Sequence, residues 1–373
     1  MTRPSSTFAV IAGGGTAGHV LPGLAIARAL VARGHDVEAI HMVGSERGLE
    51  ARLVPEAGFP LTLLPGRGIE RRLSLGAIRS VLEIVVAVGQ AIGLLRRLRP
   101  RVVVVLGGYA SVPCTVAAVV WRIPLVVTEQ NARAGAANRL AGRFAKACAV
   151  PFPGTDLPRA VVTGNPVREE IRAVDRAGGR DRARAELGLP LDRVVVAVFS
   201  GSLGARTLNR ATAGLAARWA DRSDVAVRHV IGRRDHDEIV ADLPDPTEGG
   251  LVYQAVAYEE RMDLLLTAAD VAVCRAGGTT VAELADVGLA AVLVPLPIAP
   301  RDHQTANAGP LVAAGAAVLV PDDALDVDRL ASELGPLVDD PARLADMGRA
   351  AATLARPDAA AAVAALAEEH ARP

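Results

Sequence analysis

The sequence predicts an α/β protein with two doubly wound parallel sheets. Short apolar runs alternate with helix-like segments along the whole chain. Most of these runs are continuous in Val, Ile, Leu and Ala, as in parallel strands that are buried on both faces. A strand followed by a glycine-rich turn and a helix begins at Phe8, and the same pattern restarts at Val194. The chain therefore resembles two Rossmann-like halves in tandem.

The expected strands fall into one set in each half. The first set is Phe8–Ala12, Val37–His41, Leu61–Leu64, Val102–Leu106, Leu125–Thr128, Ala147–Val150 and Val161–Thr163. The second set is Val194–Phe199, Val225–Val230, Leu251–Ala255, Val271–Cys274, Ala291–Val294 and Val318–Val320. A polar, charged stretch over residues 164–190 separates them. We expect an N-terminal domain over residues 1–165, a C-terminal domain over 166–345, and a helical tail over 346–373 that packs back on the N-terminal domain.

Composition excludes several classes of protein. The 373 residues suit two domains, and 51% apolar residues with 22% charged residues indicate a globular chain. The formal net charge is zero, so we expect no nucleic-acid partner. Cys114, Cys148 and Cys274 are scattered, which argues against a metal or disulfide framework. The polar N-terminus has no signal-peptide core, so we expect the protein on the cytoplasmic side.

The first glycine turn, Gly13–Gly18, fits the G-x-G-x-x-G pattern of dinucleotide-binding folds. A dehydrogenase also needs an acidic residue at the end of the second strand to hold the ribose. The expected second strand ends at His41 and Met42, with Asp36 and Glu38 at its start. This placement disfavours NAD, and we expect no cofactor.

Two further glycine turns also lie between a strand and a helix, at Ser200–Ala205 and at Cys274–Leu284. Glycines at such a turn let the backbone approach a phosphate, while the helix N-terminus supplies N–H donors and a positive dipole. The alternative is a tight turn with no ligand. Glycine turns in both halves suit one substrate on each side of a cleft: a nucleotide sugar and a second phosphorylated molecule.

Seven ordered motifs carry a more specific resemblance. They are GGTAGHVLPGLAIA, GGYASVPCTVAA, EQNARAGAANR, GNPVR, SGSLGARTLN, CRAGGTTVAEL and PLPIAPRDHQTANA. Together they resemble the MurG family of N-acetylglucosaminyltransferases of peptidoglycan synthesis. The resemblance implies a GT-B fold, with two Rossmann-like domains and an interdomain cleft. It implies transfer of GlcNAc from UDP-GlcNAc to the MurNAc 4-hydroxyl of lipid I, with inversion, to form lipid II.

The resemblance also implies site residues, position by position. Thr16, Gly18 and His19 of the first loop would lie near the sugar and the acceptor, with Tyr109 on the acceptor side. The implied catalytic residues are His19, Thr16 and Tyr109. The implied contacts to the donor come from Asn131, Arg168 and Ser202, from Glu283 on the ribose, and from Gln304 and Asn307 near the GlcNAc hydroxyls. Leu203 and His303 stand where many members of the family have glutamine.

Chemistry offers an alternative at several of these positions. His19 starts a helix, where the dipole lowers the pKa of an imidazole and suits it to act as a neutral base; it equally suits a loop cap. Glu283 also fits an ordinary helix residue near a positive dipole. Arg168 pairs well with a phosphate but equally fits a solvated linker charge.

Metal-dependent transferases often use an Asp-x-Asp pair. Two such strings occur, Asp235-His236-Asp237 and Asp326-Val327-Asp328. Neither adjoins a glycine turn, so we interpret both as chance matches. Helix N-termini and arginine can neutralise a departing diphosphate, and we expect no metal.

The segment Leu73–Arg99 is the most apolar of the chain, and arginines flank it. It fits either a buried helix or a surface that lies on anionic lipid headgroups, with Trp121-Arg122 as an interfacial anchor. A lipid-linked acceptor favours peripheral attachment to the inner leaflet at the cytoplasmic face of the cell membrane. The implied partners are therefore UDP-GlcNAc, lipid I and the membrane, together with proteins of cell-wall synthesis and division.

Several rival interpretations remain open from the sequence. The nearest is another GT-B transferase that uses a UDP-sugar and a different lipid or natural-product acceptor. A UDP-sugar epimerase leaves the acceptor-side motifs without a role. A dehydrogenase and a non-catalytic UDP-sugar binding protein are the rivals from other classes.

Overall fold

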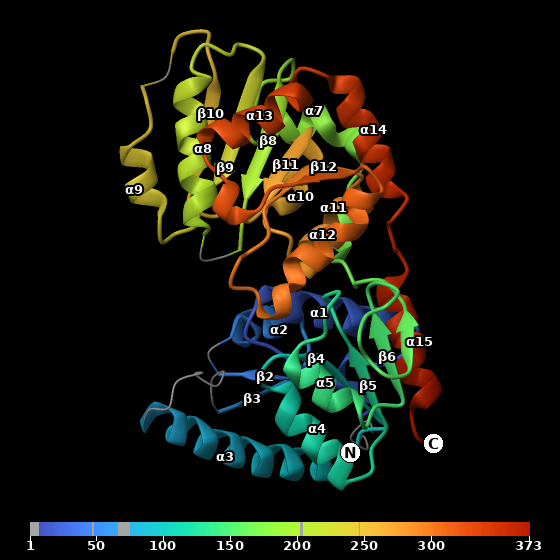
Figure 1. Ribbon diagram of the computed structural model, residues 1–373. Coiled ribbons are helices and arrows are strands. Elements are labelled where there is room, and N and C mark those ends of the chain that lie inside the picture. The colour runs from blue at the N-terminus through green and yellow to red at the C-terminus, as the bar shows by residue number, and fades with distance from the viewer. Residues whose placement is uncertain (1–6, 47, 66–74, 202–203, 246) are drawn as a thin grey trace. The chain divides into compact units, whose positions relative to one another are not determined.

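The computed structural model describes residues 7–46, 48–65, 75–201, 204–245 and 247–373. The chain divides into two compact units (Figure 1). Unit 1 is Met1–Arg168 together with Arg356–Pro373, and unit 2 is Glu169–Ala355. The last segment of the chain therefore belongs to the same unit as the first.

Unit 1 contains a seven-stranded, wholly parallel sheet in the order β3-β2-β1-β4-β5-β6-β7. Its strands are β1 Ala9–Gly13, β2 Ile40–Ser45, β3 Leu61–Leu64, β4 Val102–Gly107, β5 Leu125–Thr128, β6 Ala147–Val150 and β7 Ala160–Val162. The strand order reverses between β1 and β4. In open parallel sheets, ligands bind beyond the carboxyl ends of the strands at such a reversal.

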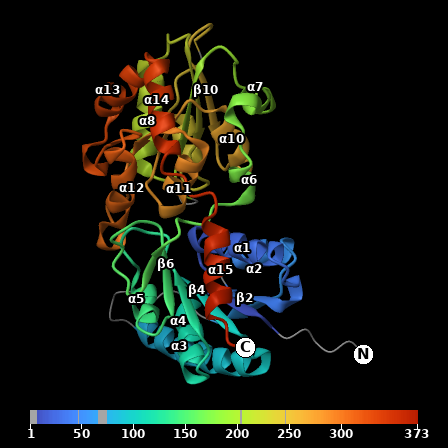
Figure 2. The same ribbon diagram turned by 90° about the vertical axis from the view of Figure 1, so that its right-hand side faces the viewer.

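Helices cover both faces of this sheet, because most residues of its inner strands are apolar and buried on both sides. One face packs against α3 Leu75–Leu98, α4 Ser111–Val120 and α5 Ala136–Gly142. The other packs against α1 Ala17–Ala32, α2 Glu50–Glu56 and α15 Ala359–His370. Figure 2 shows α15 beside α1, and Val363, Ala364 and Ala367 of α15 are fully buried in this core.

Unit 2 repeats the arrangement with six parallel strands in the order β10-β9-β8-β11-β12-β13. The strands are β8 Val194–Phe199, β9 Val225–Val230, β10 Val252–Val256, β11 Val271–Cys274, β12 Ala290–Leu293 and β13 Ala317–Leu319. The helices are α6 Glu169–Arg172, α7 Arg176–Glu186, α8 Arg206–Arg218, α9 His236–Ala241, α10 Met262–Ala268, α11 Gly278–Val287, α12 His303–Ala313, α13 Val327–Val338 and α14 Pro341–Ala352. One face packs against α8, α13 and α14, and α7 and α10 lie on the other.

The expected strands are confirmed, and one of them is displaced. Residues Val37–Ala39 form a 3-10 turn, and β2 runs from Ile40 to Ser45 in place of Val37–His41. Register explains the shift, because β2 pairs with β1 from Ile40 onward and with β3 through Ser45. Glu46 thus follows β2 directly, so the argument that no acidic residue ends this strand was wrong.

The segment Leu73–Arg99 was expected to be either a buried helix or a surface. Its described part, α3, buries one side against the sheet and exposes apolar side chains on another. Ala87, Ala91, Leu94 and Leu95 are buried against the sheet, whereas Val85 and Val86 are 63% and 53% exposed. Among the described residues, no helix is long and apolar enough to span a membrane.

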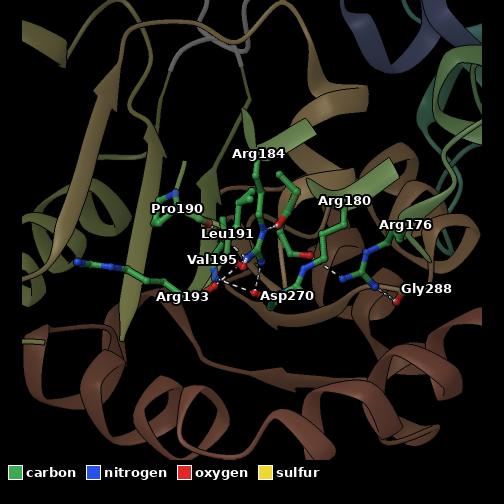
Figure 3. A network of polar contacts seen from close by, with 11 residues as sticks. Arg176, Arg180, Arg184, Pro190, Leu191, Arg193, Val195, Asp270 and Gly288 are labelled. Atoms are coloured by element: carbon green, nitrogen blue, oxygen red, sulfur yellow. Dashed lines mark hydrogen bonds and ion pairs between the residues drawn. The ribbon is translucent and has the colours of Figure 1, made fainter. Parts of the chain in front are cut away.

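An arginine network holds α7 to the amino-terminal edge of the second sheet (Figure 3). Arg184 is wholly buried, and its guanidinium donates to Asp270 Oδ2 at 2.6 Å and to the carbonyl oxygens of Ala268 and Arg193. Asp270 also accepts from Arg180 and from the backbone N–H of Val195. A single carboxylate therefore joins α7, β8 and the start of β11.

Candidate active site

The carboxyl edge of the first sheet gathers the loops that follow β1, β4 and β5. Thr16 caps α1 in an extended conformation, with φ −135° and ψ 158°. Its hydroxyl makes no cap hydrogen bond to the helix backbone and lies 3.2 Å from His19 Nδ1. In the described part of the chain, the Thr16 hydroxyl, at 3.7 Å, is the one group within 4 Å of a Cβ built on Gly18, in the first turn of α1. The loop thus orients an imidazole by means of its own cap residue.

His19 is partly buried, and this burial lowers the pKa of its imidazole. The charges of Glu129 and Glu50 act in the opposite direction but are the smaller effects. The pKa therefore stays below the ordinary value of 6.5, and the ring is mostly neutral at pH 7. A neutral imidazole that keeps some exposed surface can accept a proton from a bound hydroxyl.

Glycines of the β4–α4 turn allow this close packing. Gly107 has φ +98°, and a Cβ there would lie 3.2 Å from His19 Nε2 and 3.3 Å from Asn138 Nδ2. Gly108 has φ +75°, and its Cβ would lie only 2.4 Å from the carbonyl oxygen of Gly14. A Cβ on Gly108 would push the two loops apart, and a Cβ on Gly107 would crowd the His19 ring.

Glu129 organises the loop that follows β5. This carboxylate is 2% exposed. Its Oε1 accepts from the backbone N–H groups of Gln130 and Asn131 and from Asn131 Nδ2, each at 3.0 Å. Its Oε2 accepts from the Gly135 N–H at 3.0 Å and from Asn138 Nδ2 at 2.9 Å. Asn131, expected at the donor sugar, is therefore oriented by a buried charge.

Tyr109, expected on the acceptor side, has its hydroxyl engaged within unit 1. The hydroxyl donates to the carbonyl oxygen of Pro65 at 2.9 Å. Burial, with a smaller effect from the charge of Glu83, raises the pKa of Tyr109 above its ordinary value. Tyr109 is thus a neutral donor that ties the β4–α4 turn to the end of the β3 segment.

In unit 2 the loops after β8, β11 and β12 share the corresponding edge of the second sheet. Glu283 lies in the second turn of α11 and is 9% exposed. Gln304 lies at the start of α12, and its Oε1 accepts from the Leu296 N–H at 2.9 Å, which directs the amide nitrogen the other way as a donor. Asn307 is fully buried and donates to the carbonyl oxygen of Ala276, so it braces the turn that begins α11.

The second glycine turn rests on a buried polar chain. A Cβ on Gly204, which has φ +76°, would lie 2.6 Å from the carbonyl oxygen of Ile231 and 3.4 Å from Asn209 Nδ2. Asn209 Oδ1 lies 3.1 Å from Nε2 of the fully buried His229, whose Nδ1 lies 2.6 Å from the Tyr253 hydroxyl. Burial lowers the pKa of His229 to about 3, so this chain stays neutral.

Of the remaining expected positions, Arg168 is described by the structure and others are not. Arg168 closes the first segment of unit 1 and is partly buried. Ser202 and Leu203 lie outside the described residues, as do Arg71 and Arg72 beside the apolar segment. Within the described part of the chain, no cluster of three His, Cys, Asp or Glu side chains is arranged to hold a metal.

Both Asp-x-Asp strings have other tasks in the structure. Asp235 is buried, accepts from Arg206 and Arg234, and has a pKa held at about 2, chiefly by its hydrogen bond from Arg234. Asp326 caps α13 by accepting from the Arg329 N–H. One carboxylate of each string therefore stabilises the fold through hydrogen bonds within unit 2.

Sequence reasoning assigned no role to Glu50, Glu129 or Asn138, although all three are buried around His19. Glu129 and Asn138 lie within the motif EQNARAGAANR, from which the resemblance implies a role for Asn131 alone. The sequence does contain a signal for Glu50: it is an acidic residue five positions after the end of β2, in a short segment between Gly48 and Gly58. Because the expected second strand ended at His41 and not at Ser45, Glu50 did not stand out as a residue near the end of a strand.

Comparison with known proteins identifies this architecture. Residues 9–150 match the glycosyltransferase family 28 N-terminal domain, and residues 195–363 match the glycosyltransferase family 28 C-terminal domain. The chain is thus a family 28 glycosyltransferase with the GT-B fold. A relative from Mycolicibacterium vanbaalenii is 45% identical over 97% of this chain and 90% of its own length. Its name is UDP-N-acetylglucosamine--N-acetylmuramyl-(pentapeptide) pyrophosphoryl-undecaprenol N-acetylglucosamine transferase.

The crystal structure of Acinetobacter baumannii MurG superposes with a TM-score of 0.77 at 29% identity, covering 97% of this chain and 99% of that one. The chain belongs to the MurG family. A Neisseria meningitidis UDP-GlcNAc 2-epimerase bound to UDP-GlcNAc has a TM-score of 0.63 at 13% identity over 95% and 96% of the two chains. That likeness shows the fold alone.

Proposed function

We propose that this protein transfers GlcNAc from UDP-GlcNAc to the MurNAc 4-hydroxyl of lipid I, undecaprenyl-pyrophosphoryl-MurNAc-pentapeptide, and so forms lipid II. The observation that carries the proposal is identity of 45% over nearly the full length of a relative that bears the name of this activity. The folded motifs agree with it, because both sheets present glycine turns at their carboxyl edges.

His19 is the proposed general base. Its neutral imidazole would take the proton from the acceptor hydroxyl as that oxygen attacks the anomeric carbon of GlcNAc. Attack from the face opposite to the departing UDP inverts that carbon. Thr16 would hold the ring through Nδ1, which is why its hydroxyl is not spent on capping the helix. Gly18 would give the acceptor access, and Tyr109 would position the acceptor side of the loop.

The donor would be bound chiefly by unit 2. Glu283 would accept hydrogen bonds from the ribose hydroxyls, and Gln304 would donate its amide N–H to a GlcNAc hydroxyl. Ser202, Arg168 and the N-termini of α8 and α11 would bind the diphosphate, whose departing charge they would stabilise. The remaining expected contacts to GlcNAc are Asn131 of unit 1 and Asn307, which acts through the turn at Ala276.

The direct test supplies purified protein with radiolabelled UDP-GlcNAc and a short-chain lipid I analogue. Labelled disaccharide-lipid that forms only with acceptor supports the proposal. Formation of free GlcNAc or a 2-epimer without acceptor would exclude it in favour of the rival chemistries. A matched pair of variants, His19→Gln and His236→Gln at a histidine of unit 2 that is 27% exposed, separates loss of the base from loss of any histidine.

We also propose that unit 1 attaches the enzyme peripherally to the anionic inner leaflet at the cytoplasmic face of the membrane. An exposed apolar surface, the α3–α4 patch, supports this: Val85, Val86, Val119, Val120 and Trp121. The guanidinium of Arg96 lies 5.8 Å from the centre of the Trp121 ring, and α3 and α4 lie side by side (Figure 1). Apolar side chains fringed by arginine suit an anionic lipid surface.

The attachment is tested by sedimentation with vesicles of phosphatidylglycerol and phosphatidylcholine. The double variant Val85→Ser/Val86→Ser should sediment less than wild type, because it removes the most exposed apolar side chains of α3. The control is Val240→Ser, at a valine of unit 2 that is 40% exposed. Equal sedimentation of all three proteins would refute the role of the patch. Partners among cell-wall synthesis and division proteins would meet the enzyme at the same membrane.

A further inference from the structure

Glu50 is a charged group in an unusual setting. It begins α2, yet its side chain turns inward and is 1% exposed. Three glycines make room for it, because a Cβ on Gly14, Gly44 or Gly48 would lie 2.1, 2.2 or 2.0 Å from its side-chain atoms. The backbone of the first glycine turn and the end of β2 thus form a close-fitting cradle for one carboxylate.

Among the described residues, the hydrogen-bond donors to the carboxylate come from Gly15 and Ser45 of this cradle. Oε1 accepts from the Ser45 N–H at 2.6 Å and from the Ser45 hydroxyl at 2.9 Å. The Gly15 N–H lies 3.1 Å from both Oε1 and Oε2. In dinucleotide-binding folds, N–H groups of this turn meet a phosphate. Here one of them already meets an anion of the protein's own chain.

Burying a carboxylate has a substantial desolvation cost, which hydrogen bonds from backbone N–H groups offset. Such a group fixes the backbone that donates to it. Gly15 is the residue directly before Thr16, and Thr16 contacts His19 Nδ1. The charge of Glu50 also reaches His19, where it and Glu129 oppose the effect of burial on the imidazole.

We propose that Glu50 is a positioning residue for the transfer reaction: it occupies the anion position of the first glycine turn and thereby holds Thr16 and His19 in place for the acceptor hydroxyl. The expected effect on transfer rests on the proposed function, whereas the placement of Thr16 and His19 by Glu50 does not. It also assigns the turn a different task from the one that its sequence pattern suggests. In this proposal the first turn positions the base, whereas the turns of unit 2 bind the diphosphate of UDP-GlcNAc.

The test compares Glu50→Gln with Glu56→Gln, a control on the same helix whose side chain is 56% exposed. Glutamine keeps the size of the side chain but removes its charge and presents an N–H donor to the donors of the cradle. We expect kcat to fall roughly 10- to 100-fold, as for a misplaced catalytic group, with the affinity for UDP-GlcNAc unchanged. The control should match wild type.

A second readout does not require activity. The His19 imidazole is titrated by NMR and assigned by its loss in His19→Gln. Removal of the Glu50 charge should lower the pKa of His19, because one of the two carboxylates that favour the protonated ring is gone. An unchanged His19 titration and an unchanged kcat in Glu50→Gln would overturn the proposal. Loss of donor affinity and of thermal stability in parallel with kcat would also overturn it, since the role would then be structural.

The variant Ser45→Ala covers the case in which Glu50→Gln does not fold. It removes one donor to Oε1 but keeps the charge. We expect a smaller fall in kcat with the His19 titration and donor affinity preserved, and an unchanged kcat would overturn the proposal. If wild type forms no product with lipid I analogue while Glu50→Gln still shifts the His19 titration, the proposed function fails and the placement of His19 by Glu50 stands.

Discussion

Removal of the Arg184 guanidinium should destabilise unit 2 strongly. In Arg184→Met the aliphatic stem remains, but the side chain no longer donates to Asp270 or to the carbonyl oxygens of Ala268, Leu191 and Arg193. Each buried acceptor that is left unpaired costs about 1–3 kcal/mol, and loss of one partner of a buried ion pair costs about 3–5 kcal/mol.

Two contacts reduce this cost. Asp270 keeps the guanidinium of Arg180 at 2.8 Å and the Val195 N–H at 2.7 Å, and it is 16% exposed, so water can reach it. We therefore expect the free energy of unfolding to fall by about 3–5 kcal/mol, the range for a broken buried pair, and not by the sum of all the lost bonds. For a domain of this size that corresponds to roughly 6–20 °C in Tm.

The assay is thermal and urea unfolding of the full chain, followed by tryptophan fluorescence. Trp219 packs in the core of unit 2 and reports on its unfolding. The control is Arg182→Met on the same helix, because Arg182 is 85% exposed and pairs only with Glu186 at the surface in the described structure. Its cost should stay below about 1 kcal/mol. Similar losses in both variants, or a loss below about 1 kcal/mol in Arg184→Met, would refute the reasoning.

Three further outcomes are expected. Gly108→Ala should abolish most transfer while donor binding persists, because its Cβ would lie 2.4 Å from the carbonyl oxygen of Gly14; kinetics and UDP-GlcNAc titration check this. Burial lowers the pKa of His229 to about 3, so between pH 6.5 and pH 3 only the unfolded chain binds this proton, and folding becomes less favourable as the pH falls. Urea unfolding at pH 7 and pH 5 should show that the free energy of unfolding falls by about 2 kcal/mol. The variant His229→Gln should lack this loss. Turnover should persist in EDTA, because Asp235 and Asp326 serve the fold; loss of turnover that magnesium restores would contradict this.

The fold was largely predictable because its strands are continuous apolar runs. A strand buried on both faces, such as Val102–Gly107, is recognisable without knowledge of its neighbours. The end of the second strand was not recognisable in this way, because it contains Gly44 and Ser45, which have low strand propensity. Pairing with β1 and β3 decides its register, and such pairing is invisible in a local pattern.

The motifs name some residues of the candidate site, but they do not name the residues whose part in it depends on burial. Thr16 and His19 both belong to the first motif, and their side chains lie 3.2 Å apart. The tasks of Glu50 and Glu129 depend on N–H groups brought together from distant segments, which no spacing rule contains. Asn307 illustrates the converse, since a motif residue expected at a sugar lies fully buried against Ala276.

The closing helix α15 gives the chain an unusual order of assembly. Its residues Val363, Ala364 and Ala367 complete the core of unit 1, although they are synthesised after the whole of unit 2. During synthesis, the apolar side of α1 stays uncovered while some 190 residues are added, a delay of roughly 10–40 s at about 5–20 residues per second. A stop codon near Arg356 would therefore leave unit 2 intact and damage the unit that was made first. The core of unit 1, which contains the first residues of the chain, is therefore complete only after the last helix has been synthesised.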